Sequence, residues 1–192
     1  GYNHYTWLQS QEKMRRLIPR PLRRMAGWVA AHGLPLGFRG RNHCIGFAGD
    51  LPHSIAHVNL YFDAVKRREL LAPSGWSAAR SAESYKSSLC APDYSTLQMA
   101  SRVDFQTTMA DGYLVKVDRA SMLNSLELRA PFLDHRLIEF AFGRVPDTLR
   151  AVGGERKILS RRLAERLLPK ELDLKRKQGF SMPFDAWFRG PW

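Results

Sequence analysis

Residues 113–138, YLVKVDRASMLNSLELRAPFLDHRLI, limit most strongly what this chain can fold into. The first part predicts a helix over residues 113–128 that ends before Pro131, because proline restricts the backbone of the residue before it. At 100° per residue the apolar side chains form two stripes: Val115, Met122 and Leu126 on one, and Leu114, Val117 and Leu128 on the other. A helix with two apolar stripes is typical of a largely buried element.

Charged side chains lie between these two stripes. Lys116 and Glu127 are eleven residues apart, as are Asp118 and Arg129, so the members of each pair are nearly in line. At 1.5 Å per residue each pair spans roughly 16 Å, which is too far for a direct ion pair within the helix. Because a buried unpaired charge is costly, we expect each charge to find its partner elsewhere.

Glu127 is the least expected of these charges, since it falls in the last predicted turn, where the helix dipole favours cations. Two interpretations stay open. In the first, Glu127 forms a structural salt bridge to another helix. In the second, it is a carboxylate of a functional site with Arg129 beside it. Periodicity alone does not separate them.

The stretch LVKVDRASMLNSLELRAPFLDHRLIEFA resembles the signature of the asparagine synthetase C-terminal (synthetase) domain, roughly LLVKVDRxSMxxSLExRxPFLDHRLxEFA. Near the other end, LKRKQGFSMPFDAW resembles the family's RxKxGFxxPxxxW element, with Lys175 in place of its arginine. The first residues, GYNHY, resemble the end of a FGGYxRY segment that follows the family's acidic GxGADE-type loop, and His4 replaces its basic residue.

This resemblance implies that residues 1–192 are a partial domain: the helical C-terminal half of an α/β adenine-nucleotide-hydrolase-like (ATP-pyrophosphatase) synthetase domain. An ATP-binding half with an SGGxDS loop and an N-terminal glutaminase domain would be its partners. ATP and Mg²⁺ would activate the aspartate side chain as an acyl-adenylate, and ammonia would displace AMP to give asparagine. The main ligands of both cofactors are expected outside these residues, which alone would be inactive.

The resemblance also implies roles for particular residues. Lys177 would stabilise negative charge on the reacting phosphate, a preorganised electrostatic contribution. Glu127 and Arg129 would lie on the acceptor and intermediate side of the cleft, and Lys116 and Asp118 would be supporting ion-pair residues. Relatives that close β-lactams, form macrolactams or amidate other carboxylates share the scaffold, so the acceptor stays open. A basic helical binding module is the alternative outside enzymes.

Composition narrows the partners. The 30 Lys and Arg residues exceed the 18 Asp and Glu residues, and the formal net charge of +12 favours an anionic partner such as nucleotide phosphates or an acidic domain. The basic residues are dispersed, so nucleic acid is disfavoured. Cys44 and Cys90 give neither a disulfide framework nor a metal pattern, which is typical of a reduced, cytoplasmic protein. No apolar run has the length of a membrane span. Whether the protein forms a homodimer is left open.

Taken by itself the chain predicts an all-α unit of about eight helices, since no segment alternates with period two. Residues 33–50 are rich in glycine and predict a loop. We expect Asp134 to N-cap its helix and Gly143 to end it. His53 and His57 are four apart, a metal-ligand spacing, but no third ligand is evident and surface or core roles are favoured over zinc. The predicted helices are 6–17, 22–32, 53–71, 77–88, 93–109, 113–128, 135–142 and 155–168.

Overall fold

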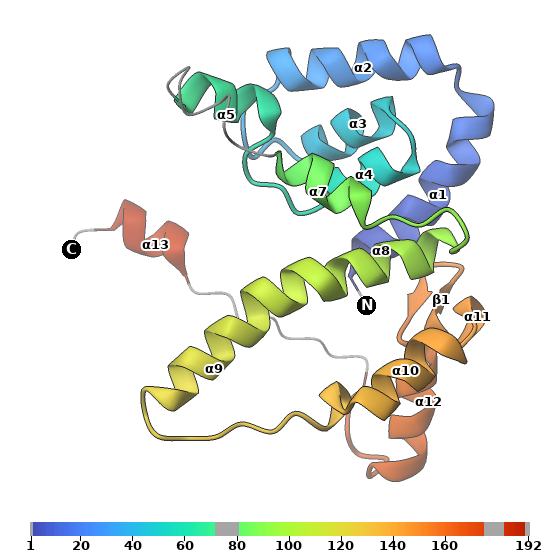
Figure 1. The fold of residues 1–192 in the computed structure, drawn as a ribbon, viewed down its shortest axis with the longest axis vertical. Helices are drawn as coiled ribbons and strands as arrows, with labels where there is room; N and C mark the ends of the chain where they lie inside the picture. Colours follow the sequence, from blue (N-terminus) through green and yellow to red (C-terminus); the bar gives the residue numbers. More distant parts are fainter. Residues whose placement is uncertain (1, 72–80, 175–182, 191–192) are drawn as a thin grey trace.

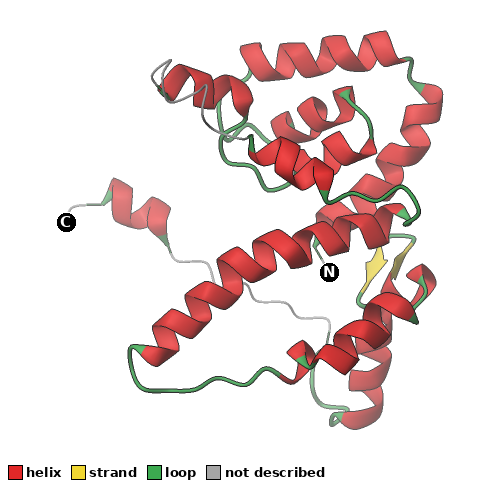
Figure 2. Cartoon of the chain, viewed as in Figure 1, coloured by secondary structure: helices red, strands yellow, loops and turns green. Residues whose placement is uncertain are grey.

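The computed structural model describes residues 2–71, 81–174 and 183–190. Figure 2 shows that helices make up most of this part of the chain. The α-helices are α1 (Asn3–Leu17), α2 (Arg20–Gly33), α3 (Arg41–Ala48), α4 (Leu51–His57), α5 (Ala64–Leu70), α7 (Ala82–Ser88), α8 (Thr96–Asp104), α9 (Val115–Met122), α10 (His135–Gly143), α11 (Asp147–Arg150), α12 (Ile158–Leu167) and α13 (Phe184–Arg189). A π-helical segment, η1 (Phe105–Leu114), joins α8 to α9, and a 3₁₀ turn, η2 (Pro131–Leu133), precedes α10.

The expected helical character is confirmed, but the described residues form more and shorter helices than the eight predicted. They also contain a short antiparallel ribbon that the sequence did not predict. In it β1 (Ala151–Val152) pairs with β2 (Glu155–Arg156) across a turn in which both glycines have positive φ. The α/β class stays a prediction, because it concerns the half of the domain that we expect outside these residues.

A continuous helical rod formed by α8, η1 and α9 crosses the middle of the molecule. Helices α1 to α5 and α7 lie on one side of it, and α10 to α12 lie on the other (Figure 1). We predicted two helices, 93–109 and 113–128. The predicted break between them is wrong, and so is the predicted end of the second helix. Gly112 weakens a helix by only about 1 kcal/mol relative to alanine, so the chain continues through it. The rod then ends at Met122, before the predicted end.

Two other boundaries also differ from the sequence prediction. The predicted loop 33–50 contains α3. The predicted helix 53–71 is two helices, because Val58 is extended, Asn59 has a φ of 58°, and Asp63 starts α5 by accepting hydrogen bonds from the backbone N–H groups of Val65 and Lys66. The carboxylate of an N-cap satisfies donors that the first turn leaves unpaired.

The hydrophobic core lies where α1, α4 and α8 meet. Leu8 contributes from α1 and Ile55 from α4, and α8 adds three residues at helical spacing, Met99, Ala100 and Val103. Spacings of three and four residues bring side chains to one face of a helix. This packing fixes the start of the rod against the first helix of the chain.

Helix α2 packs on α3 through its small residues. A Cβ added to Gly27 would lie 2.4 Å from the Cβ of Ala48, so the two backbones approach as closely as glycine permits. Ala30 and Ala31 are buried on the same side, whereas Met25 and Trp28 are exposed. Helix α2 therefore packs through its small residues and leaves the face with Met25 and Trp28 open.

A buried ion pair joins α3 to the start of α5. Arg41 is 2% exposed and donates to the carboxylate of Asp63, which is 3% exposed. The same guanidinium donates to the carbonyls of Ala31 at 2.8 Å and Leu34 at 3.0 Å. The charge of Arg41 is thus satisfied by one carboxylate and by the carbonyls at the end of α2.

Candidate functional site

The signature stretch, residues 113–138, begins in the last part of the rod, where most of its side chains are exposed. The sequence predicted a largely buried helix, but α9 has no buried residue. Val115, Val117 and Met122 are all exposed on it. The described part of the chain therefore leaves these three residues exposed, and the prediction of burial is wrong for them.

A turn around Ser125 closes α9. The backbone N–H of Leu123 donates to the carbonyl of Arg119 at 3.0 Å, and that of Leu126 donates to the carbonyl of Ser121 at 3.0 Å. Ser125 has a φ of 55°, the left-handed conformation that often follows the last residue of a helix. Residues 126–130 then run on without helical structure, so Glu127 does not lie in a last helical turn.

Glu127 and Arg129 form an ion pair with each other. Side chains two residues apart in an extended segment project to the same side, which explains the pairing. Glu127 is 67% exposed and Arg129 is 85% exposed. Among the described residues the partner of Glu127 is therefore the neighbouring arginine rather than another helix, and both groups are largely exposed.

Lys116 and Asp118 are exposed on α9, before the turn. The ammonium of Lys116 lies 5.3 Å from the centre of the Tyr113 ring, a cation–π contact. Within the described residues Asp118 forms no ion pair. The long-range ion pairs expected for these two charges are not formed in this part of the chain.

The start of the chain is bound to the rod by a cluster of polar aromatic residues. His4 Nε2 lies 2.9 Å from Asp104 Oδ2, and the Tyr5 hydroxyl donates to the same oxygen at 2.6 Å. The Tyr2 hydroxyl donates to that of Tyr113 at 3.1 Å. Residues 2–5 are thereby fixed beside the rod in which the signature stretch begins.

These contacts change the acidity of two tyrosines. Burial, and then the negative charge of Asp104, raises the pKa of Tyr5 well above its usual range. The hydrogen bond with Tyr113, and then burial, raises the pKa of Tyr2 to about 12. Both hydroxyls therefore stay protonated at neutral pH and act as hydrogen-bond donors. The sequence analysis missed Asp104, because nothing in its helical pattern distinguishes it from a surface carboxylate.

Comparison with known proteins decides the family. The asparagine synthase family model matches residues 1–192. The chain belongs to the asparagine synthase family. The resemblance of the signature stretch to this family is thereby confirmed.

Curated relatives are similar along nearly the whole chain. It is 31% identical over 191 residues to asparagine synthetase [glutamine-hydrolyzing] 1 of Bacillus subtilis (strain 168), which covers 98% of this chain and 29% of that protein. It is 30% identical over 175 residues to a putative asparagine synthetase [glutamine-hydrolyzing] of Mycobacterium tuberculosis (strain ATCC 25618 / H37Rv). That match covers 90% of this chain and 26% of the mycobacterial protein. Bos taurus asparagine synthetase [glutamine-hydrolyzing] is 35% identical over 82 residues, a match that covers 40% of this chain and 15% of the bovine protein.

The chain thus spans less than a third of the length of the curated relatives it matches. No solved structure matches it. None of the helices in the described residues is long and apolar enough to cross a membrane.

Lys177, the expected catalytic residue of this asparagine synthase family chain, lies outside the described residues. Two other residues of the LKRKQGFSMPFDAW stretch are described. Pro183 precedes α13, and Trp187 lies on α13, where its ring packs edge-on against the Phe184 ring with 5.5 Å between the ring centroids. The role of Lys177 therefore stays a prediction.

No group of three or more metal-ligating side chains converges within the described residues. His57 is buried and its Nδ1 lies 2.8 Å from the carbonyl of His53, while the two rings lie 4.1 Å apart. This geometry fits a core histidine that bonds its own helix, as the sequence analysis favoured over zinc.

Proposed function

We propose that this chain is the C-terminal part of an enzyme that forms amides at the expense of ATP, with aspartate as the acceptor and asparagine as the product. The observation that carries this proposal is the match to the asparagine synthase family over residues 1–192. The reaction would pass through an acyl-adenylate of the aspartate side chain with release of pyrophosphate. Ammonia would then displace AMP.

The exposed ion pair supports an acceptor-binding role for Glu127 and Arg129. A guanidinium binds a carboxylate through two parallel hydrogen bonds, so Arg129 would orient the aspartate carboxylate. Glu127 would hold the ammonium group of the substrate or the incoming ammonia. Because the two charges compensate each other and face solvent, they are held without a large desolvation cost until a ligand binds.

Lys116 and Asp118 would support this site from the last helical turns of the rod, where both are exposed. Lys177 would hold its ammonium near the reacting phosphate and stabilise the charge that develops there. ATP would supply the adenylyl group, and Mg²⁺ would screen its phosphates. The main ligands of both would come from outside these residues.

The exposed apolar side chains around the end of the rod support a second part of the proposal. Leu123, Leu126 and Phe132 are all exposed. Large apolar side chains that are exposed along one segment are candidates for contact with another protein surface. We propose that the ATP-binding half of the domain covers it, that a glutaminase domain supplies ammonia, and that the whole enzyme works in the cytoplasm. The 192 residues alone would then be inactive.

The test is pyrophosphate release by the full-length protein with ATP, Mg²⁺, aspartate and ammonia. Lys177→Ala is expected to lower the rate by about 100-fold or more, because it removes one preorganised positive charge. Lys170→Ala is the matched control: it removes the same charge from an exposed position after α12 and should leave the rate unchanged.

Normal turnover by Lys177→Ala would remove this lysine from the mechanism. Pyrophosphate release that does not depend on aspartate would reject aspartate as the acceptor. It would favour another carboxylate, as in relatives that form lactams or amidate other acids.

A further inference from the structure

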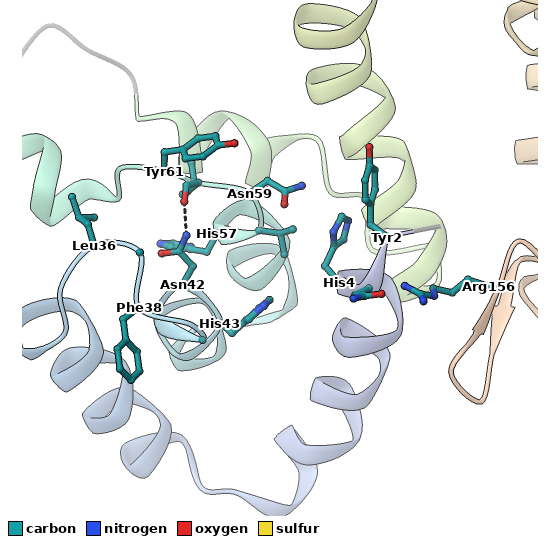
Figure 3. A pocket seen from close by; sticks show the side chains of 15 residues that line it. Tyr2, His4, Leu36, Phe38, Asn42, His43, His57, Asn59, Tyr61 and Arg156 are labelled. Atoms are coloured by element: carbon teal, nitrogen blue, oxygen red, sulfur yellow. Dashed lines mark hydrogen bonds between the residues drawn. The ribbon is translucent and has the colours of Figure 1, made fainter. Parts of the chain in front are cut away.

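We propose that a cavity of about 530 Å³ beside the N-terminus of α1 binds a small polar molecule with one anionic group, a carboxylate or a phosphate. Its walls come from the start of α1, the turn before α3, α3 itself, the segment that follows α4, and β2 (Figure 3). The volume lies within the range of small-molecule sites in proteins. This inference does not rest on the proposed function, since none of Lys116, Asp118, Glu127 and Arg129 lines the cavity.

The inner wall of the cavity is polar and buried, and its rim is aromatic. His4 and His57 are buried, whereas Tyr2, Phe38 and Tyr61 are exposed at the opening. A concave site with convergent polar groups and an aromatic edge can hold a small ligand on several sides. The arrangement is therefore that of a binding site rather than of a gap between apolar helices.

The charge of the lining selects an anion. Fifteen residues line the cavity, and none of them is Asp or Glu. Arg156 supplies a fixed positive charge, and Figure 3 shows it reaching from β2 toward the start of α1. Its side chain forms no ion pair with any described residue. A carboxylate or phosphate would therefore meet a guanidinium that no acid of the described residues already occupies.

Asp104, an acid that contacts the lining residue His4, is already engaged. It accepts hydrogen bonds from the Tyr5 hydroxyl and from Nε2 of His4. His4 thus stands between the cavity and this carboxylate. The bonds to Asp104 also fix the orientation of the His4 ring, so that this part of the wall is rigid before any ligand arrives.

The other two histidines supply neutral hydrogen-bonding groups. Burial, and then His4, lowers the pKa of His43, and burial, and then His53, lowers the pKa of His57. Both rings are therefore neutral at neutral pH. The carbonyl of His53 can only accept, so His57 donates from Nδ1 and keeps Nε2 as an acceptor. An acceptor fits a hydroxyl or amide N–H of the ligand rather than its anionic group.

Two asparagines extend this neutral part of the wall. Asn42 donates to the carbonyl of Leu60 (the dashed line in Figure 3), which fixes α3 to the segment after α4 and leaves the side-chain oxygen of Asn42 without a partner in the described residues. Asn59 lines the same edge in the left-handed conformation that asparagine tolerates. One cation with several neutral polar groups matches a ligand with one charge and a hydroxylated or amide-bearing body.

Calorimetric titration of the full-length protein tests the site with three matched probes: glycerol 3-phosphate, glycerate and glycerol. They share a hydroxylated body and carry a phosphate, a carboxylate or no charge. We expect saturable binding of at least one anion and no measurable binding of glycerol. The anion that binds more tightly identifies the anionic group of the ligand.

Two variants assign the binding to this cavity. Arg156→Gln is expected to weaken the binding of the anion about tenfold or more, because it removes a charged hydrogen-bond donor. Arg144→Gln removes the same charge from an exposed position outside the cavity and should leave the affinity unchanged. The Trp7 ring lies 3.8 Å from that of His43, so binding should also change Trp7 fluorescence, and Trp7→Phe should abolish that change.

Three results would overturn the inference. They are the absence of saturable anion binding, glycerol binding as tight as that of either anion, and equal affinities in Arg156→Gln and Arg144→Gln. None of these results depends on turnover, so the cavity can fail while the proposed amide synthesis stands.

Discussion

The unit of α1–α5, α7 and α8 and the signature stretch at the end of the rod use similar residues in opposite ways. In the unit, polar side chains find partners across helices: Ser54 donates to Gln11 at 2.8 Å, and Thr96 donates to Glu12. In the signature stretch the apolar residues of α9 are exposed, and Glu127 pairs with Arg129, the arginine two residues further along the chain. Helices α1, α4 and α8 pack against each other around a core, whereas α9 has no buried residue.

This difference shows what an amphipathic pattern can establish. Apolar residues at helical spacing indicate that a helix has a contacting surface, but not that the surface belongs to the neighbouring residues. For α8 the pattern and the packing agree, since Met99 and Val103 are buried. For α9 the same kind of pattern leads to exposure. Substitutions should therefore affect folding in the unit and function in the signature stretch.

The largest effect on stability is expected at the buried ion pair. Asp63→Ala leaves the charge of Arg41 unpaired in the interior and removes the N-cap of α5, and we expect a loss of about 3–5 kcal/mol in the free energy of unfolding. Denaturant unfolding measures it. Asp118→Ala removes an exposed aspartate that has no ion pair in the described residues, and should change stability by no more than about 0.5 kcal/mol. Equal losses in the two variants would break the contrast between the regions.

The same ion pair predicts a dependence on pH. Burial of Asp63 acts to raise its pKa, but the hydrogen bonds from Arg41 and from the backbone N–H of Lys66 outweigh it, and the pKa is lowered. A carboxyl group with a lowered pKa in the folded state stabilises the fold above its unfolded pKa, about 3.9, and loses that contribution as the pH falls further. The difference in stability between the wild type and Asp63→Ala should therefore shrink below about pH 4.

A smaller effect is expected where α2 meets α3. Gly27→Ala would place a methyl group 2.4 Å from the Cβ of Ala48, so the helices must separate, at a cost of about 1–3 kcal/mol. The control is Gly143→Ala at the end of α10, where an added Cβ meets nothing within 4 Å. It should be neutral or stabilising, because alanine favours the helix. Thermal unfolding of both variants measures the two effects. If Gly27→Ala were as stable as the wild type, the close packing of α2 on α3 described above would be wrong.

Much of the helical layout follows from local signals in the sequence. The prediction that Asp134 caps the helix after it is confirmed, since its carboxylate accepts from the backbone N–H of Arg136 at 2.9 Å and α10 ends at Gly143. The end of α9 was mispredicted for a physical reason. Helical spacing of apolar residues continues to Leu128, and Ser125 is not a residue that usually marks a left-handed turn. The left-handed turn at Ser125 therefore ends the helix although the apolar periodicity continues.

The candidate sites were predictable only in part. The placement of Arg129 beside Glu127 follows from their closeness in sequence, and it is confirmed, whereas their roles and that of Lys177 remain predictions. The anion cavity could not have been predicted. It brings His4, His43 and Arg156 together from separate elements, and a single sequence carries no signal for such contacts.

Glu127→Gln tests the central claim most directly, because glutamine keeps the shape of the side chain and removes its charge. Unfolding and asparagine formation should be measured on the same full-length preparation. We predict a change in stability within about 0.5 kcal/mol, as for an exposed ion pair, together with a loss of turnover of about 100-fold or more. Normal turnover with unchanged stability would contradict the account, and so would a loss of turnover that unfolding fully explains.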